Sequence, residues 1–219
     1  FLGKKLRFRT LSFLIILCVV LVGGTSLHNL YFASRIGEAP ATSLGYSVYV
    51  GFNPRSLGTW NIEDSEKLQS YNEQEDLSAS EVQENMMQEA INRIQTESIP
   101  FAYLFYQKAA SLWSNDSMCV RYAGDAISHP TLAHAVCNAF YVLTWLMSAI
   151  GAIYMFKRKD HSLLLLLPLY VIGLTMSHLF TEVAIRYHYS GIIALTILSA
   201  YGFHCILEQC KSPKNYNHN

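Results

Sequence analysis

Long runs of residues without formal charge constrain this chain more than any other feature. Three of them are Thr131–Phe156, Ser162–Phe180 and Tyr189–Leu207, and none contains Lys, Arg, Asp or Glu. About 20 apolar residues in an α-helix cross the roughly 30 Å of hydrocarbon in a bilayer, because each residue adds about 1.5 Å. The three runs therefore predict membrane-spanning helices and an all-α membrane protein.

A fourth apolar run, Leu11–Gly24, is shorter, and two interpretations of it stay open. Extended through Leu30, it reaches the length of a membrane span. The basic residues before it, its short apolar stretch and the pair Gly23 and Gly24 are also typical of a signal peptide. A retained span and a signal peptide both carry the following segment across the membrane.

The basic residues predict how the helices are oriented, because Lys and Arg are enriched in cytoplasmic flanks. Nine of the 16 basic residues flank the apolar runs: Lys4, Lys5, Arg7, Arg9, Lys157, Arg158, Lys159, Lys211 and Lys214. Four helices with both termini in the cytoplasm place all nine on one side of the cell membrane. The predicted domains are an N-terminal transmembrane helix at 1–30, an extracytoplasmic domain at 31–129, a three-helix transmembrane bundle at 130–208 and a cytoplasmic tail at 209–219.

The predicted extracytoplasmic domain is acidic and mostly helical. The whole chain has a net charge of zero, which excludes a nucleic-acid binder with a basic surface, but residues 35–125 carry a net charge of −7. Ser78 and Glu81 fit a capping box, and Val82, Met86, Ala90, Ile91 and Ile94 then predict a helix at 80–96. Phe101–Trp113 predicts a second helix, at the membrane surface or against the bundle. Ser43–Asn61 is predicted to be extended or looped.

The first candidate site is the loop that ends at Asp64. It gathers amides, carboxylates and an indole ring, from Asn53, Trp60, Asn61, Glu63 and Asp64. An indole can stack on the apolar face of a sugar ring while the polar groups bind its hydroxyls. The same residues also build ordinary turns, so a sugar site and a turn both remain open. Glu63, Asp64 and Glu66 also suggest a divalent cation, against the simpler interpretation of a solvated acidic face.

The second candidate site is Thr181–Tyr189, which the predicted topology places at the outer membrane surface. Glu182 and Arg186 are four residues apart and would face each other on a helix. Arg186, with His188, is suited to bind an anionic group such as a lipid phosphate, because a guanidinium group matches phosphate bidentately. A structural ion pair with interfacial tyrosines is the competing interpretation.

Several features, taken in chain order, resemble one family. They are Gly51-Phe-Asn53, the run Gly58-Thr-Trp-Asn-Ile-Glu-Asp64, the acidic helix, the segment from Lys108 through Trp113 to Asp116, and Glu182 with Arg186 and Tyr187 before the last apolar run. The pattern is similar to the C-terminal part of bacterial multi-pass glycosyltransferases of the GT-C class, the relatives of protein mannosyltransferases and aminoarabinose transferases. The resemblance runs from about Gly45 to Gly202.

This resemblance implies a membrane enzyme that moves a sugar from a polyprenyl-phosphate donor to a glycan, lipid or protein acceptor on the outer face of the membrane. Arg186 would lie near the donor phosphate. The family also implies a catalytic carboxylate soon after the first span, and Glu38 does not match the acidic pair of that pattern. The chain is therefore expected to be a C-terminal fragment without its catalytic half, inactive alone. The alternative is a non-enzymatic multi-pass membrane protein whose outer domain binds a ligand or partner.

Overall fold

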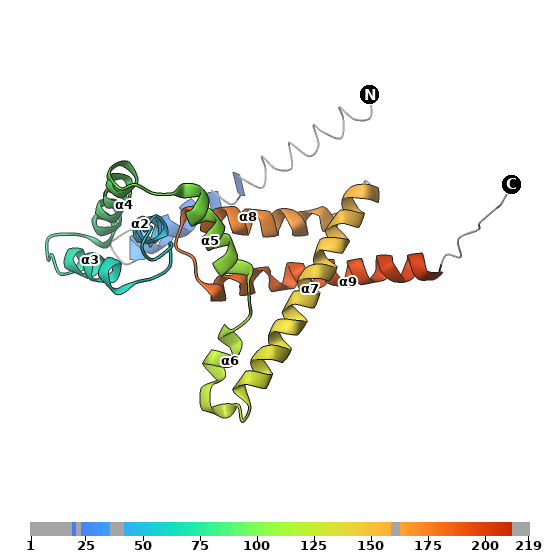
Figure 1. Cartoon of the computed structure of the whole chain (residues 1–219). Coiled ribbons are helices and arrows are strands. Elements are labelled where there is room, and N and C mark those ends of the chain that lie inside the picture. The colour runs from blue at the N-terminus through green and yellow to red at the C-terminus, as the bar shows by residue number, and fades with distance from the viewer. Residues whose placement is uncertain (1–18, 21–22, 36–41, 159–162, 212–219) are drawn as a thin grey trace.

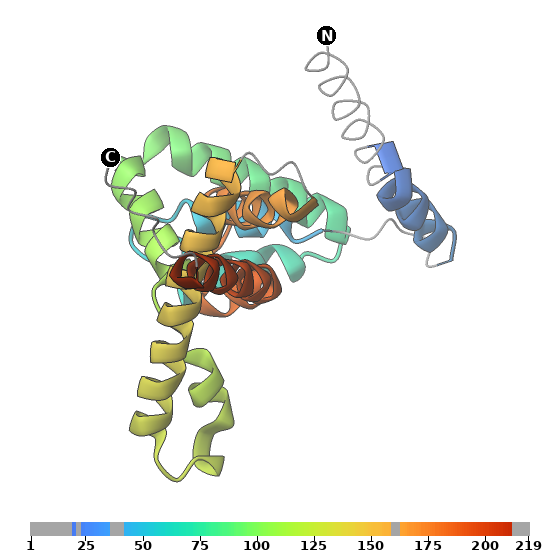
Figure 2. The ribbon, with the colours of Figure 1, turned by 90° about the vertical axis from the view of Figure 1, so that its right-hand side faces the viewer.

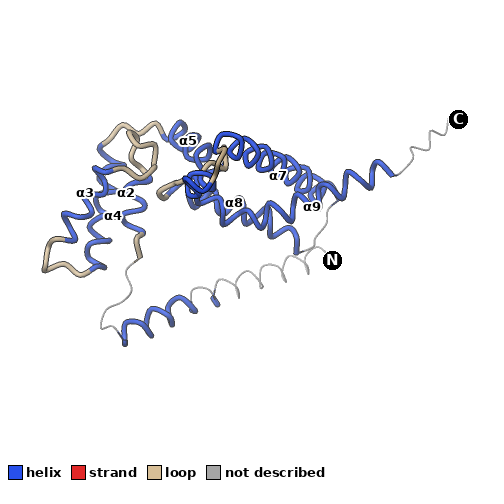
Figure 3. Tube along the Cα trace, turned by 90° about the horizontal axis from the view of Figure 1, so that it is seen from below, coloured by secondary structure: helices blue, strands red, loops and turns tan. Residues whose placement is uncertain are grey.

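The computed structural model describes residues 19–20, 23–35, 42–158 and 163–211 of the chain. Within these ranges all regular structure is helical, and Figure 3 shows the helices joined by loops. The all-α prediction is therefore confirmed for the described residues. Most of Leu11–Gly24 lies outside them, and so does the choice between a span and a signal peptide, although residues 23–35 are helical.

The helices form a small lobe at one end of a set of long apolar helices (Figure 1). The lobe contains α2 (Leu44–Gly51), α3 (Ile62–Asn72) and α4 (Ala79–Thr96). The apolar helices are α7 (Pro130–Arg158), α8 (Leu166–Phe180) and α9 (Tyr189–Lys211), and they follow α5 (Phe101–Trp113) and α6 (Met118–Ala123). Both α7 and α8 pack against α9, which Figure 2 shows nearly end-on.

Helix α4 supplies one face of the lobe core and begins as predicted. The Ser78 hydroxyl oxygen accepts from the Glu81 backbone amide at 3.4 Å, and Glu81 accepts from the Ser78 amide at 2.8 Å. These two hydrogen bonds complete the capping box. Val82 and Met86 are buried on the same helix face, together with Ala90. Ile91, which was predicted to share that face, is 40% exposed.

Helix α2 differs from the prediction that Ser43–Asn61 is extended or looped. Residues 44–51 form a helix, in which Tyr46 and Val50 pack against Met86 of α4. Gly45 permits the close contact, because a Cβ atom at this position would lie 1.9 Å from the Gln83 carbonyl oxygen. Packing against α4 thus overrides the low intrinsic helix propensity of this Gly-, Tyr- and Val-containing segment.

Two stretches are long and apolar enough to cross a membrane, namely Pro130–Arg158 and Ile185–Cys210, each with a mean hydropathy of 1.7. Helix α8 has 15 residues. It is therefore about 22 Å long, shorter than the roughly 30 Å of a bilayer core. It ends at Phe180, and the backbone amides of Glu182 and Val183 then bond the lobe. Among the described residues, the structure thus contains two helices of spanning length. Four spans were predicted, and most of the first lies outside the described residues.

Candidate functional site

The segment Asn53–Asp64, here called the Trp60 loop, leaves α2 through a tight turn. The Asn53 side-chain oxygen accepts from the backbone amides of Arg55 at 2.9 Å and Ser56 at 3.2 Å. Asn is favoured in turns because its side chain can make such local hydrogen bonds. Gly58 follows with a φ of +73°, a conformation that glycine adopts without a steric penalty. The sequence therefore fixes the path of this loop locally.

Asp64 lies at the centre of the polar residues of the Trp60 loop and is 2% exposed. Its Oδ2 accepts from the amides of Asn53 at 2.9 Å and Asn61 at 2.7 Å, and its Oδ1 accepts from Arg93 at 2.9 Å. The structure thus brings together three of the predicted residues, Asn53, Asn61 and Asp64. Both asparagines bond Asp64, and Asp64 bonds Arg93, which favours the turn interpretation for these three.

The remaining predicted residues of the Trp60 loop face outward. Trp60 is 56% exposed and Glu63 is exposed as well, and so is Glu66, which follows the loop on α3. The Trp60 ring is therefore accessible to a stacking partner. The predicted cluster of Glu63, Asp64 and Glu66 is not assembled, because Asp64 turns inward to Arg93. In the described part of the chain, no group of three or more His, Cys, Asp or Glu side chains is placed to hold a metal ion.

Residues Thr181–Tyr189, here called the Arg186 loop, connect α8 to α9. Glu182 and Arg186 do not form the predicted pair on a helix, because residues 181–184 are not helical. Glu182 accepts a hydrogen bond from the Tyr187 hydroxyl at 3.3 Å instead. The Arg186 guanidinium carbon lies 5.3 Å from the centroid of the Tyr187 ring, and interaction with the Tyr122 and Tyr187 side chains raises the pKa of Arg186.

Arg186 keeps its charge available to a ligand. The residue is exposed, and among the described residues no carboxylate lies within ion-pair distance of it. It immediately precedes the apolar helix α9, at the end that faces the lobe. A guanidinium group without a carboxylate partner is a good ligand for phosphate, which it can bind through two parallel hydrogen bonds.

The Arg186 loop is attached directly to the lobe by its backbone. The Glu182 amide donates to the Ser47 carbonyl oxygen at 2.7 Å, and the Val183 amide donates to the Gly58 carbonyl oxygen at 2.9 Å. Gly58 belongs to the Trp60 loop, so the two candidate sites are in contact. The sequence did not predict this contact, because it joins residues more than a hundred positions apart.

His188 does not share a surface with Arg186 as predicted. It is fully buried, and its ring lies among those of Trp113, Tyr141 and Tyr189. Its Nδ1 atom pairs with the Ile185 carbonyl oxygen. The physical reason is the 3-10 turn over residues 185–188, because positions two apart in such a turn point in different directions. His188 therefore packs the base of the loop, and Arg186 alone faces outward.

Two basic residues that we did not assign to a site from the sequence hold the loops in place. Arg93 of α4 bonds Asp64, and Lys108 of α5 is 1% exposed. The Lys108 amino group donates to the carbonyl oxygens of Gly51 at 2.9 Å and Leu179 at 2.8 Å. Burial lowers the pKa of Lys108 to about 7. One feature of the sequence could have indicated the role of Lys108, namely a single lysine within the aromatic helix Phe101–Trp113. A lysine that is buried in such a helix needs hydrogen-bond partners from other elements.

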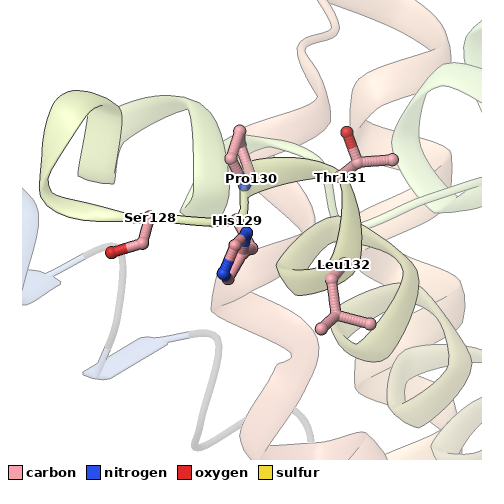
Figure 4. A pocket seen from close by; sticks show the side chains of 5 residues that line it. All are labelled: Ser128, His129, Pro130, Thr131 and Leu132. Carbon is pink, nitrogen blue, oxygen red and sulfur yellow. The ribbon is translucent and has the colours of Figure 1, made fainter.

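Two hollows lie away from these loops. One, of about 390 Å³, is at the start of α7, and Figure 4 shows that a single stretch, Ser128–Leu132, lines it. All five lining residues are exposed, so this is an open depression. The other, of about 190 Å³, lies among α7, α8 and α9 and is mostly apolar, with Trp145, Ala149, Phe156, Ile172 and Leu198 among its lining residues.

Comparison of the chain with family models, curated proteins and solved structures finds no match. A functional proposal for this chain therefore depends on the geometry of the two loops and on the sequence resemblance.

Proposed function

We propose that this chain is the donor-binding part of a membrane glycosyltransferase that uses a polyprenyl-phosphate-linked sugar. Arg186 binds the donor phosphate, and Trp60 stacks against the sugar. The observation that carries the proposal is the pair of backbone hydrogen bonds that attaches the Arg186 loop to α2 and to Gly58 of the Trp60 loop. A lipid-linked sugar presents a phosphate next to a sugar ring, and the two attached loops offer a group suited to each.

The apolar helices support a membrane location for the proposed site. In the most apolar part of Pro130–Arg158 only 22% of the residues are buried within the protein, and in that of Ile185–Cys210 only 33%. Outward side chains such as Phe140 and Ile193 are 71% and 73% exposed. Apolar surface of this extent is stable in hydrocarbon and unfavourable in water. In our proposal, α7, α8 and α9 lie in the cell membrane, both chain termini are cytoplasmic and the lobe is extracytoplasmic.

The hollow among α7, α8 and α9 is consistent with a lipid-linked donor. It is lined mainly by apolar side chains and lies among the apolar helices that follow the lobe. A prenyl chain gains free energy from burial in such a groove only to the extent that the groove fits it better than the surrounding lipid does. We therefore assign most of the donor specificity to the phosphate and the sugar.

Arg186→Ala is expected to weaken binding of a polyprenyl monophosphate by about 10- to 100-fold, because a charge-assisted hydrogen-bond pair is lost. The measurement is a titration of the chain in lipid nanodiscs with the polyprenyl monophosphate, and with the uncharged polyprenol as a reference ligand. The polyprenol should bind the wild-type chain and the variant equally.

Arg121→Ala is the matched control for this experiment, because Arg121 is also exposed but lies on α6, outside the Arg186 loop. It should bind the polyprenyl monophosphate as the wild-type chain does. The same titration in nanodiscs rich in phosphatidylglycerol tests whether Arg186 binds anionic lipid headgroups in general. The phosphate role of Arg186 is refuted if the Ala variant keeps wild-type affinity.

Trp60→Ala is expected to weaken binding of the sugar-bearing donor by about fivefold, and to leave binding of the bare polyprenyl monophosphate unchanged. A stacking contact contributes about 1 kcal/mol, and it exists only when the sugar is present. Ile62→Ala is the control, because Ile62 is 59% exposed on the same segment. Equal loss of affinity for both ligands would show that Trp60 acts through loop structure and not through the sugar.

A second candidate function is a non-enzymatic membrane protein whose outer lobe binds a ligand or partner. One observation favours it: Asn53, Asn61 and Arg93 all bond the Asp64 carboxylate, and so form a scaffold for the loop. The two functions differ in the first titration. Wild-type nanodiscs that bind polyprenyl monophosphate no better than polyprenol would favour the non-enzymatic protein.

A further inference from the structure

Lys108 occupies the point where the lobe, α5 and the Arg186 loop meet. It is the largest of the fully buried side chains in the described part of the chain. Its amino group donates to the Gly51 carbonyl oxygen at 2.9 Å and to the Leu179 carbonyl oxygen at 2.8 Å. These two acceptors belong to different elements, since Gly51 ends α2 and Leu179 lies in the last turn of α8. One side chain of α5 therefore bonds both the lobe and the apolar helices.

The two carbonyl groups are suitable partners for a buried amine. Carbonyl groups in the last turn of a helix have no partner within the helix, and the end of each helix carries about half a negative charge. The partial negative charges of the two ends offset part of the cost of burying the amine. The Phe52 ring lies 5.6 Å from the nitrogen and adds a weaker attraction. Lys108 thus satisfies two helix ends that are otherwise far apart in the sequence.

Two glycines near Lys108 are closely approached by the neighbouring loop and side chain. A Cβ atom at Gly51 would lie 2.6 Å from the Thr181 carbonyl carbon, and one at Gly58 would lie 2.8 Å from the Lys108 Cδ atom. Both contacts are closer than packed atoms allow. The Trp60 loop, the Arg186 loop and the Lys108 side chain are therefore closely packed at these two glycines.

We propose that Lys108 is the positioning residue of the candidate site. Lys108 holds the Arg186 loop against the lobe and so determines the position of Arg186 relative to the Trp60 loop. The positioning itself stands on the contacts of Lys108, and its consequence for donor binding rests on the proposed function. Without the two Lys108 hydrogen bonds, the attachment of the Arg186 loop to the lobe depends mainly on the backbone hydrogen bonds of Glu182 and Val183. The Arg186 loop then separates more often from Ser47 and from Gly58 of the Trp60 loop.

The Lys108 amine makes both hydrogen bonds in either charge state. A neutral amine has two N–H groups, which match the two carbonyl oxygens, and an ammonium group has a third that faces no carboxylate among the described residues. Of the charged groups on the adjacent loop, Glu182 accepts from Tyr187, and Arg186 lies over the Tyr187 ring. The main electrostatic effect on Lys108 is therefore loss of water, which disfavours the charged form.

This loss of water makes the docking of the Arg186 loop dependent on pH. The folded pKa of Lys108, about 7, lies below the ordinary value of 10.5. Between these two values the open loop, with Lys108 in water, binds more protons than the closed loop. Protection of the closed loop therefore rises with pH from about 7 to 10.5 and is constant below about 7, with a limit of about tenfold per pH unit.

Hydrogen exchange of the chain in nanodiscs tests the proposal without any ligand. Lys108→Met is expected to raise the exchange rate of amides 182 and 183 by about 10- to 100-fold and to leave the amides of α4 and α7 unchanged. Lys67→Met is the control, because Lys67 pairs with Glu89 on the lobe surface. Unchanged exchange at 182 and 183 in Lys108→Met would overturn the proposal.

Gly51→Ala provides a second way to displace the same loop, through the Thr181 backbone. If Lys108 acts by docking the loop, the two substitutions together should raise exchange little more than either alone. The wild-type pH profile needs no variant. Corrected for intrinsic exchange rates, protection of amides 182 and 183 should rise above pH 7, and a flat profile would contradict burial of the amine in the docked loop.

The polyprenyl monophosphate titration separates this inference from the proposed function. Faster exchange in Lys108→Met together with weaker ligand binding supports both. Faster exchange with wild-type affinity, when Arg186→Ala does lose affinity, overturns the role of Lys108 in donor binding and leaves the proposed function in place. Faster exchange when neither variant changes affinity supports the docking role and refutes the phosphate role of Arg186.

Discussion

Asp64→Ala is expected to unfold the lobe at neutral pH. Asp64 is 2% exposed and accepts hydrogen bonds from Asn53, Asn61 and Arg93. The Arg93 side chain is itself only 10% exposed. Loss of Asp64 leaves Arg93 with only the exposed Glu97, at 3.4 Å, as a carboxylate partner, and it leaves the Asn53 and Asn61 amides without their acceptor. Together these losses cost about 3–5 kcal/mol. A loss of this size is comparable to the whole stability of a small domain.

Guanidinium unfolding of the lobe, followed by near-ultraviolet circular dichroism, measures the effect. Glu66→Ala is the matched control, because Glu66 is an exposed acidic residue of the same helix, and its loss should change the free energy of unfolding by less than about 0.5 kcal/mol. Asp64→Asn keeps an acceptor oxygen but removes the charge, so it should fall between the two. A stable Asp64→Ala lobe with weakened sugar binding would restore Asp64 as a ligand residue and reject its structural role.

The helices that the sequence predicts are those whose signals are local. The capping residues of α4, the aromatic run of α5 and the uncharged runs of α7 and α9 all lie within single segments, and the structure has a helix at each. The helix α2 was missed because its stability depends on α4, which approaches Gly45 from a distant part of the chain. The sequence of Ser43–Asn61 alone therefore does not indicate this contact with α4.

The candidate site was predictable only in its parts. Only eleven positions separate Asn53 from Asp64, and the turn residues Asn53 and Gly58 fold this short segment back so that Asn53, Asn61 and Asp64 converge. The partners of Lys108 lie 57 and 71 positions away, and those contacts follow from the packing of helices and not from any spacing in the sequence. The same packing explains why His188 is buried while Arg186, two residues earlier, is exposed. Local chemistry indicated the residues, and tertiary packing decided which of them reach the surface.

Gly202→Val is expected to separate α7 from α9. A Cβ atom at Gly202 would lie 2.1 Å from the Met147 carbonyl oxygen, and one at Gly151 would lie 2.3 Å from the Leu198 carbonyl oxygen. Each helix therefore places a glycine against the backbone of the other. The close approach also allows Ser148 to donate to the Leu195 carbonyl oxygen across the interface at 2.6 Å. Small residues and interhelical hydrogen bonds of this kind stabilise helix pairs in lipid.

A valine side chain at position 202 meets backbone atoms, which cannot turn aside as a side chain can. Overpacking of a core typically costs about 1–3 kcal/mol, and we expect at least the upper end because both the packing and the Ser148 hydrogen bond are lost. Thermal unfolding in detergent micelles measures the change. Gly173→Val is the matched control, since no atom lies within 4 Å of its Cβ position, so its melting temperature should match wild type. Equal melting temperatures for the Gly202 and Gly173 variants would mean that α7 and α9 do not pack through these glycines.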